Sequence, residues 1–448
     1  MNKPDLRLQA APADPFSNRR AWYVVILLAT LYALSFVDRF ILALLVQPLS
    51  AEFGLVDTQL GLLLGAGFAF VYSLAGLPLA NLLDQGQRRR IVAAGAMVWS
   101  IATVASGFTR SFEMLAICRA FVAIGEAVLS PAAISLIADM FPANKRSLPV
   151  SIYASVPSVM GIGAFIVGGA ALDLATHVGP ALSMSAWRMT LVIVGVPGIF
   201  LSLLFLFSVR EPERVKAAGS DDKTDLRAFF AYFRQTLGMF LPLFLGVGCG
   251  AIASYGIVSW TPTLLIRAYG VGAANAGYLF GGVVGSAALT AAFIWPSIAR
   301  RMSRPGTADG LMRCLVVATL LSLPFLIAAP FASSSVPLLV ALGLGNFMLA
   351  CYAVIMSLSI QAYGQSRMRA RLVATYLLFS NVLGATLGPF LIPVAAKLWP
   401  GDPKALGYGL ALISGCVLPF AAFLFWLSLR TARLTALADG APSGRLPA

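Results

Sequence analysis

Long apolar segments alternate with short polar ones along the whole 448-residue chain. Each apolar segment is about 20 residues or longer, enough for an α-helix to cross roughly 30 Å of hydrocarbon. A transmembrane β-barrel would show segments of about ten residues with alternating polarity, whereas these runs are continuous. The pattern predicts an all-α polytopic membrane protein with twelve transmembrane helices, which we place at residues 22–46, 58–82, 91–108, 112–139, 148–173, 187–209, 236–266, 272–298, 311–330, 335–362, 372–397 and 405–429.

Composition excludes a soluble protein and argues against a metalloprotein. Charged residues make up 11% of the chain and hydrophobic residues 59%, whereas soluble domains carry about 25% charged residues. The five cysteines are dispersed, mostly within spans, and the one histidine, His177, lies in a predicted outer loop. We therefore expect neither disulfides nor a metal cluster, and no cofactor is implied.

The formal net charge of +14 is explained by membrane orientation. When alternate loops are assigned to opposite sides, 25 of the 32 Lys and Arg residues fall on the side of both termini, five fall on the other side and two lie inside spans. Lys and Arg concentrate on the cytoplasmic side of membrane proteins. We expect an integral protein of a bacterial inner (plasma) membrane with both termini in the cytoplasm, and no nucleic-acid partner.

A charged strip divides the spans into two groups of six. Residues 210–235, REPERVKAAGSDDKTDLRAFFAYFRQ, hold eleven charged residues, and the apolar residues of their second part recur at helical spacing. This part predicts an interfacial helix on the cytoplasmic leaflet; a plain solvated connector is the alternative. We predict an N-terminal six-helix half (1–209), this linker (210–235), a C-terminal half (236–430) and a cytoplasmic tail (431–448).

Two further features fit duplicated halves. Basic loops follow span two (QGQRRR, 85–90) and span eight (ARRMSR, 299–304), about half the chain apart. Six-helix halves around a midplane cavity are typical of one large class of secondary transporters. Small residues in spans five and eleven would allow close helix contact between the halves, although static packing needs them equally; they are Gly161, Gly163, Gly168, Gly169, Gly384 and Gly388.

The segment PLANLLDQGQRRR (78–90) resembles the loop signature after the second helix of the major facilitator superfamily. Asp84, Arg88 and Arg89 match this signature, whereas Ala80 replaces its leading Gly and Gln85 an Arg. The resemblance implies the fold of that superfamily, a monomer, and a latch that holds the cytoplasmic helix ends together.

The implied latch joins Asp84 to Arg88 and Arg89, and Asp139 to Arg146. Snorkelling of the basic side chains toward lipid headgroups is the alternative, favoured for Arg90.

Other segments resemble the spinster-like branch of that superfamily. They are FVDRF (36–40), RAFVAIGEAVLSPAAISLIADMFPANKRS (119–147), PSVMGIGAFIVGG (157–169), WTPTLLIR (260–267) and NVLGATLGPFLIP (381–393). In the last, Asn381 and Ala385 stand where relatives often carry His and Asp. Spinster-like proteins are associated with lysolipids and sphingoid phosphates, so the resemblance implies an amphiphilic substrate.

Four charges are predicted inside the spans, Asp38 and Arg39 in the first and Arg119 and Glu126 in the fourth. At 1.5 Å per residue, Asp38 lies roughly 12 Å and Arg119 roughly 10 Å from the outer face, and Glu126 roughly 21 Å. Charges at such depth should face the bundle interior and pair. We predict one constellation of the four, in which Asp38 meets Arg119; a purely structural salt bridge is the alternative for that pair.

Glu126 is the predicted proton carrier. With Arg119 occupied by Asp38, its carboxyl is only partly paired, and a low dielectric favours the neutral, protonated form. Protonation would relax the pairing of Glu126 with Arg119 and shift the conformational equilibrium. Pro131 removes a backbone donor close by and displaces the carbonyl of Ala127, which suits a bent or solvated site.

The C-terminal half offers polar and aromatic residues in place of buried charges. After Asp225 the acids are Asp309, Asp402 and Asp439, none inside a span. A cavity with one charged side and one apolar, aromatic side would suit an amphiphile. The candidate lining residues, for which ordinary packing is the alternative, are Tyr255, Trp260, Asn346, Tyr352, Tyr376 and Asn381.

These features predict a secondary active transporter, proton-coupled and working by alternating access, that moves an amphiphilic organic anion or lysolipid across the inner membrane. Its partners would be this substrate, protons and membrane lipids. A passive channel or lipid scramblase of the same fold is the alternative. An enzyme is disfavoured because the spans hold no acid pair at catalytic spacing and no histidine, and no G-x-x-x-x-G-K-[ST] loop indicates an ATP-driven pump.

Overall fold

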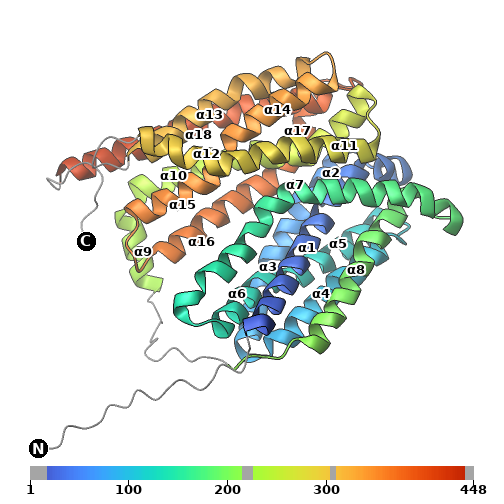
Figure 1. Ribbon diagram of the computed structural model, residues 1–448. Helices are drawn as coiled ribbons and strands as arrows, with labels where there is room; N and C mark the ends of the chain where they lie inside the picture. The colour runs from blue at the N-terminus through green and yellow to red at the C-terminus, as the bar shows by residue number, and fades with distance from the viewer. Residues whose placement is uncertain (1–17, 214–225, 303–308, 439–448) are drawn as a thin grey trace, which may run out of the picture.

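The computed structural model describes residues 18–213, 226–302 and 309–438, and within these ranges it forms helices joined by short turns. Figure 1 shows their arrangement. In chain order the α-helices and the shorter 3-10 or π segments (η) are α1 (Asn18–Phe53), α2 (Asp57–Gly61), η1 (Leu62–Ala66), α3 (Gly67–Gln85), α4 (Arg88–Ser106), α5 (Phe112–Ala127), α6 (Leu129–Met140), η2 (Ala143–Lys145), α7 (Ser147–Val178), η3 (Gly179–Leu182), α8 (Ala186–Ser208), α9 (Leu226–Gln235), α10 (Leu237–Tyr269), α11 (Ala273–Phe280), η4 (Gly281–Gly285), α12 (Ser286–Met302), α13 (Asp309–Ala328), η5 (Ala329–Phe331), α14 (Ser335–Leu349), α15 (Cys351–Tyr363), α16 (Arg369–Phe379), η6 (Ser380–Ala385), α17 (Thr386–Ala396) and α18 (Ala405–Ala438).

Each of the twelve predicted spans has its counterpart in this order. Eleven of the described helical segments are long and apolar enough to cross a membrane. The remaining predicted span, 91–108, corresponds to α4, which has three arginines in its first turn and packs along α5 and α8. The helices extend beyond the apolar runs, so that α1 continues to Phe53 and α18 to Ala438. The predicted tail (431–448) therefore begins inside α18, and its residues 439–448 lie outside the described ranges.

Several crossing helices are interrupted. Wider π-helical turns occur at η1, η4 and η6, and such turns concentrate at functional sites in proteins. A break at Val128 separates α5 from α6, two residues after Glu126 and three residues before Pro131. The expectation that this proline disturbs the helix near Glu126 is thus met by the backbone.

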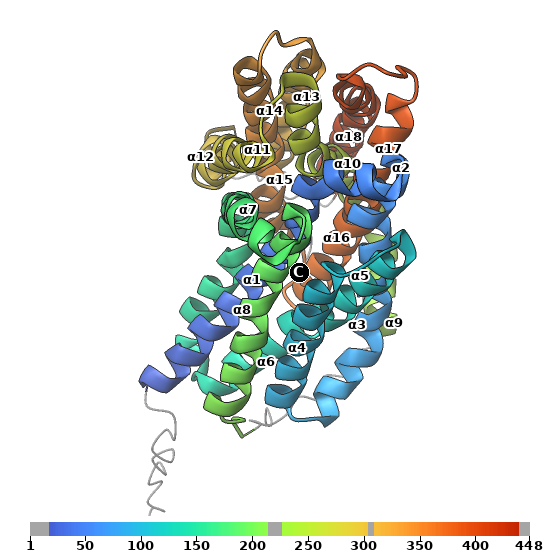
Figure 2. The ribbon, with the colours of Figure 1, turned by 90° about the vertical axis from the view of Figure 1, so that its right-hand side faces the viewer.

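The helices form two bundles, α1 to α8 and α10 to α18, which lie on opposite sides of the molecule in both views (Figures 1 and 2). We call the face where α1 begins and α18 ends the terminal face, and the face where α1 ends and α2 begins the far face. Contacts between the bundles join α2 and η1 to α17, α7 to α11 and η4, and α1 to α10. The contacting ends of α2, α11 and α17 all belong to the far face.

The packing of buried residues divides at the same level. One cluster of buried residues contains the part of α1 from Val37 to Leu49 together with residues of both bundles. A second cluster takes α1 from Ala21 to Leu31 and includes residues of the N-terminal bundle only. The bundles are therefore packed together toward the far face and separately toward the terminal face, and the dividing level on α1 lies beside Asp38.

The predicted linker helix is present as α9 and packs on the C-terminal bundle. Phe229 and Tyr232 are buried, and the Tyr232 hydroxyl accepts a hydrogen bond from the Gln365 backbone at 3.3 Å. Phe230 remains 64% exposed. Placement of α9 on a membrane leaflet stays a prediction, and residues 214–225 of the linker lie outside the described ranges.

Candidate functional site

The four predicted intramembrane charges meet inside the N-terminal bundle. Arg39 Nη2 lies 2.6 Å from Glu126 Oε2, and Arg119 Nη1 lies 3.6 Å from Asp38 Oδ1. Asp38, Arg119 and Glu126 are buried, whereas the Arg39 side chain keeps 28% of its surface exposed. We call these four residues the charge cluster. Its formal charge is zero, which makes its burial tolerable.

The pairing inside the charge cluster differs from the prediction. Glu126 binds Arg39 of α1 and not Arg119 of its own helix. Arg119 and Glu126 are seven positions apart on α5, about 10 Å along the helix axis, whereas Arg39 reaches Glu126 from the neighbouring helix α1. Sequence spacing gives the depth of each charge but not the rotation of one helix against another, which decides the partner.

Three aromatic rings lie close to the Arg39 guanidinium. Its Cζ lies 4.9 Å from the ring centre of Phe68, 5.3 Å from that of Phe36 and 5.5 Å from that of Tyr72. Rings at these distances attract a cation through their quadrupole. Arg39 therefore interacts both with the Glu126 carboxylate and with aromatic rings of α1 and α3.

The charge cluster has unused hydrogen-bonding capacity. Among the described residues, Asp38 Oδ1, Glu126 Oε1, and Nε and Nη1 of Arg119 are buried without a hydrogen-bond partner. Buried polar atoms of this kind are costly unless water, a proton or a ligand satisfies them. The other Asp38 oxygen, Oδ2, accepts a 2.6 Å hydrogen bond from the hydroxyl of Thr103 on α4, a residue that the sequence argument missed.

On the C-terminal side, Tyr255, Asn381 and Tyr376 gather opposite the charge cluster. The Tyr255 hydroxyl donates to Asn381 Oδ1 at 3.2 Å, and Tyr255 interacts electrostatically with both Arg39 and Tyr376. Tyr255 of α10 is therefore near enough to interact with Arg39 of the charge cluster across the boundary between the bundles.

The other proposed lining residues make contacts inside the C-terminal bundle, as the packing alternative expects, and a cavity-lining role for them stays a prediction. Trp260 is 2% exposed, and its indole N–H donates to the Pro389 carbonyl at 2.8 Å. Tyr352 is buried, and its hydroxyl lies 2.6 Å from that of Thr319. The Asn346 amide donates to the Val284 carbonyl in η4. All three satisfy groups inside the C-terminal bundle.

At the terminal face, Arg88 is the centre of an ion-pair network. It contacts Asp139 at 2.5 Å through Nη1 and Glu211 at 2.9 Å through Nε, and Ser135 accepts a further hydrogen bond. The Arg89 backbone N–H donates to the same glutamate at 2.7 Å. The network ties α4 to α6 and to the segment after α8, all within the N-terminal bundle.

One predicted pairing of this latch is wrong, and another stays a prediction. Asp139 pairs with Arg88 and not with Arg146, whose Nε donates to the Phe141 carbonyl at 2.6 Å. The Asp84 side chain lies outside the described part of the chain. Sequence reasoning missed Glu211, for which the available signal was an acid directly after span six.

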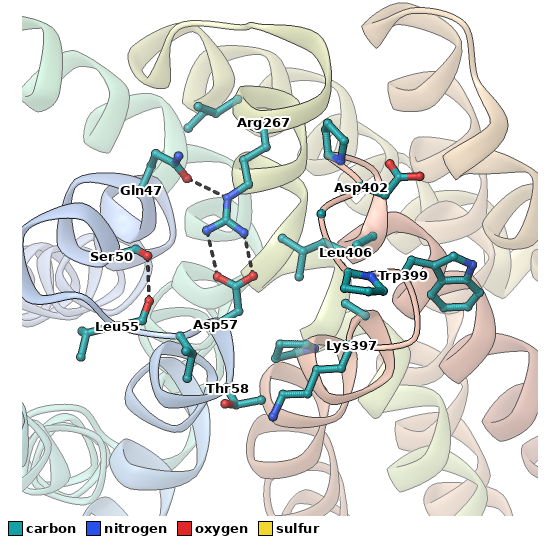
Figure 3. Close-up of a pocket in the computed structure, with 18 residues that line it drawn as sticks. Gln47, Ser50, Leu55, Asp57, Thr58, Arg267, Lys397, Trp399, Asp402 and Leu406 are labelled. Atoms are coloured by element: carbon teal, nitrogen blue, oxygen red, sulfur yellow. Dashed lines mark hydrogen bonds and ion pairs between the residues drawn. The ribbon is translucent and has the colours of Figure 1, made fainter.

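At the far face, an ion pair joins the two bundles. Arg267 at the end of α10 binds both carboxylate oxygens of Asp57 at the start of α2, at 2.6 and 2.8 Å, and its Nε donates to Gln47 at 2.7 Å. Figure 3 shows these contacts in a groove of about 820 Å³ that also receives Lys397 and Asp402 from the C-terminal bundle. The sequence argument did not pair these residues, which are 210 positions apart.

Two helical bundles packed together at one face, with paired charges buried among long apolar helices, define a polytopic membrane protein. The chain belongs to the Major Facilitator Superfamily, whose family model matches residues 28–389. It is therefore a membrane transporter and not an enzyme.

Individual relatives confirm the spinster-like resemblance. An MFS-type efflux pump of Mycolicibacterium smegmatis is 27% identical over 430 residues, covering 96% of this chain and 97% of that protein. Protein spinster homolog 3 of Danio rerio is 26% identical over 408 residues, covering 87% and 79%. The crystal structure of a bacterial homologue of the human lysosomal transporter spinster, inward-facing and unoccupied, matches with a TM-score of 0.83 at 27% identity and covers 93% of this chain and 98% of that one.

Proposed function

We propose that this transporter is a proton-coupled secondary carrier that moves an amphiphilic organic anion or lysolipid by alternating access. The observation that carries the proposal is the charge cluster. Two buried carboxyls, each with one oxygen lacking a hydrogen-bond partner, sit beside two arginines at the level where the bundles separate.

The arrangement of the bundles supports alternating access. They are joined at the far face by α2, α11, α17 and the Arg267–Asp57 pair, and pack separately toward the terminal face. With the terminal face in the cytoplasm, as the distribution of Lys and Arg suggests, this conformation is open to the inside. The matching spinster homologue is likewise described as inward-facing.

The two sides of the bundle boundary support an amphiphilic substrate. The N-terminal side offers Arg39, whose side chain is partly exposed, and the C-terminal side offers Tyr255, Tyr376 and apolar neighbours. An anionic headgroup would be attracted to the former, and an apolar body would bury surface against the latter. The name of one relative, an MFS-type efflux pump, agrees with export.

Proton coupling follows from the Arg39–Glu126 contact. While Glu126 is ionised, it holds Arg39 at 2.6 Å. Protonation removes one charge of the pair, so Arg39 becomes available to an anionic group or to the opposite bundle. Alternation between these states would link substrate binding to the proton gradient.

The test is uptake into proteoliposomes with and without a pH gradient, using a fluorescent lysophospholipid as probe. We expect gradient-dependent uptake in the wild type and loss of that dependence in Glu126→Gln. Glu113→Gln is the matched control, because Glu113 lies on the same helix but is exposed at its far-face end. Unchanged gradient dependence in Glu126→Gln would remove this residue from the mechanism.

Counterflow separates a carrier from the alternative of a channel or scramblase. Transport by a carrier saturates and is accelerated by substrate on the opposite side of the membrane. Flux through a passive pathway shows neither property. A hydrophilic sugar acid in place of the lysophospholipid tests whether the apolar body is needed.

A further inference from the structure

The Thr103 hydroxyl stands between two acceptors. Its Oγ1 lies 2.6 Å from Asp38 Oδ2 and 3.0 Å from the carbonyl oxygen of Trp99, one turn earlier on α4. Both distances are those of hydrogen bonds. Thr103 is 0% exposed and Asp38 is 1% exposed, so bulk water does not compete for either group.

A hydroxyl has one proton to donate, so Thr103 cannot donate to both acceptors at once. When Asp38 is ionised, the hydroxyl donates to the carboxylate. When Asp38 is protonated, its own O–H can donate to Thr103 Oγ1, and the hydroxyl proton turns to the Trp99 carbonyl. Threonine commonly makes this second bond inside helices. Asp38 therefore keeps a hydrogen bond in both protonation states while every heavy atom stays in place.

The remaining surroundings of Asp38 give it no comparable contact. Arg119 on α5 approaches Oδ1 only to 3.6 Å, beyond a hydrogen bond, and Oδ1 is without a hydrogen-bond partner among the described residues. Glu126 on α5 interacts with Asp38 electrostatically and is itself paired with Arg39. On α3 and α10, Tyr72 and Tyr255 interact with Arg39. Toward the terminal face, Tyr153 of α7 stacks on Tyr32.

We propose that Thr103 is a positioning residue that makes Asp38 a second proton site, coupled to Glu126, by exchanging donor and acceptor roles with its carboxyl. This inference rests on the proposed proton-coupled transport. It assigns to α4, which contributes no charge to the cluster, the role of setting the pH at which Asp38 changes state.

The test is infrared difference spectroscopy of the full-length protein in lipid nanodiscs during a pH titration. The carbonyl stretch of protonated carboxyl groups reports both the fraction protonated and the hydrogen bonding of the carboxyl. Asp38→Asn assigns the Asp38 band by removing it. Thr103→Val keeps the shape of the side chain without a hydroxyl, and Thr103→Ser keeps the hydroxyl.

We expect Thr103→Val to move the midpoint of the Asp38 band to higher pH by about one unit, because the ionised form loses a charge-assisted hydrogen bond. The band frequency should also change, since the protonated carboxyl loses its acceptor. Thr103→Ser should retain both wild-type values. Thr190→Val is the matched control: Thr190 is equally buried, and its hydroxyl donates only to its own helix, at the Ala186 carbonyl.

Two results would overturn the inference. One is a Thr103→Val midpoint and frequency equal to those of the wild type, and the other is an Asp38→Asn spectrum that keeps every titrating carboxyl band of the wild type, the Glu126 band included, with none lost. Failure of the proposed function is a separate outcome, because it appears as gradient-independent uptake by the wild-type protein in proteoliposomes. If Thr103→Val does not fold, a wild-type spectrum from Thr103→Ala, which also lacks the hydroxyl, overturns the inference equally.

Discussion

Glu126 depends on Arg39 more than Arg39 depends on Glu126. The Glu126 side chain is 1% exposed and has one short ionic contact, whereas the Arg39 side chain is 28% exposed and its guanidinium also lies near the rings of Phe36, Phe68 and Tyr72. Removal of one partner from a buried pair is costly mainly because the other charge is left uncompensated. The asymmetry in burial therefore predicts an asymmetry between the two single substitutions.

We expect Arg39→Ala to lower the melting temperature at neutral pH more than Glu126→Gln does, because it leaves Glu126 buried without its cation. Acidic pH should lessen the loss, since protonation of Glu126 removes the unpaired charge. The double variant should be more stable than Arg39→Ala alone, with a coupling free energy of about 1–3 kcal/mol. Thermal unfolding of the four proteins at two pH values measures this, and additive effects of the two substitutions would contradict it.

At the scale of helices, glycine determines how closely the bundles approach at the far face. A Cβ at Gly65 of η1 would overlap the Ala385 carbonyl oxygen and the Pro389 ring of the opposite bundle. A Cβ at Gly61 would overlap the carbonyl oxygen of the same proline. At a second contact between the bundles, Gly169 of α7 packs against Ala274 of α11. The predicted glycine contact between halves thus holds for Gly169.

The other glycines singled out from the sequence have different surroundings. Gly384 and Gly388 pack on α10 inside their own bundle, where their nearest neighbours include Ala251, Ile252 and Tyr255. A Cβ at Gly161 would meet open space. Small size permits close approach but does not say which helix will be approached.

We expect Gly65→Ala to open the far face, because the added methyl group cannot fit while η1 lies against α17. Gly76→Ala is the matched control on the same crossing helix, since a Cβ at Gly76 meets no atom within 4 Å. Spin labels at the exposed Glu113 and Leu398, in a variant without the five cysteines, report the far-face distance between bundles. A distance distribution equal to that of the wild type in Gly65→Ala would contradict the tight packing.

The sequence predicted the positions of the helices more fully than the pairings between charged residues. The twelve spans followed from hydropathy because each crossing helix must be apolar for about 20 residues whatever it packs against. Depth followed from helical rise, which brought Asp38 level with Arg119. The partners Arg39 and Glu126, or Arg88 and Glu211, depend on helix rotation and on chain segments 87 and 123 positions apart. No local pattern encodes these pairings.

At the scale of the whole molecule, the bundles are held together at the far face by packing and by one bidentate ion pair. Arg267 and Asp57 remain 23% and 26% exposed, so their attraction is partly screened by solvent. The terminal-face network of Arg88 does not cross between the bundles, because its partners Asp139 and Glu211 belong to the N-terminal half. Opening of the far face therefore has to break the Arg267–Asp57 pair, whereas rocking of the bundles leaves the Arg88 network intact.

We expect Asp57→Asn or Arg267→Ala to shift the population toward a far-face-open form by about fivefold, since a partly exposed pair contributes about 1 kcal/mol. The spin labels at Glu113 and Leu398 measure this, and high salt should move the wild type in the same direction. The charge-swapped double variant, Asp57→Arg with Arg267→Asp, should restore the closed distance, whereas Lys397→Ala, which removes a charge from the same groove (Figure 3), should leave it unchanged. If the single variants keep the wild-type distance at every salt concentration, closure depends on the glycine and proline packing of η1 and α17 alone. The ion pair would then follow the conformational change without biasing it.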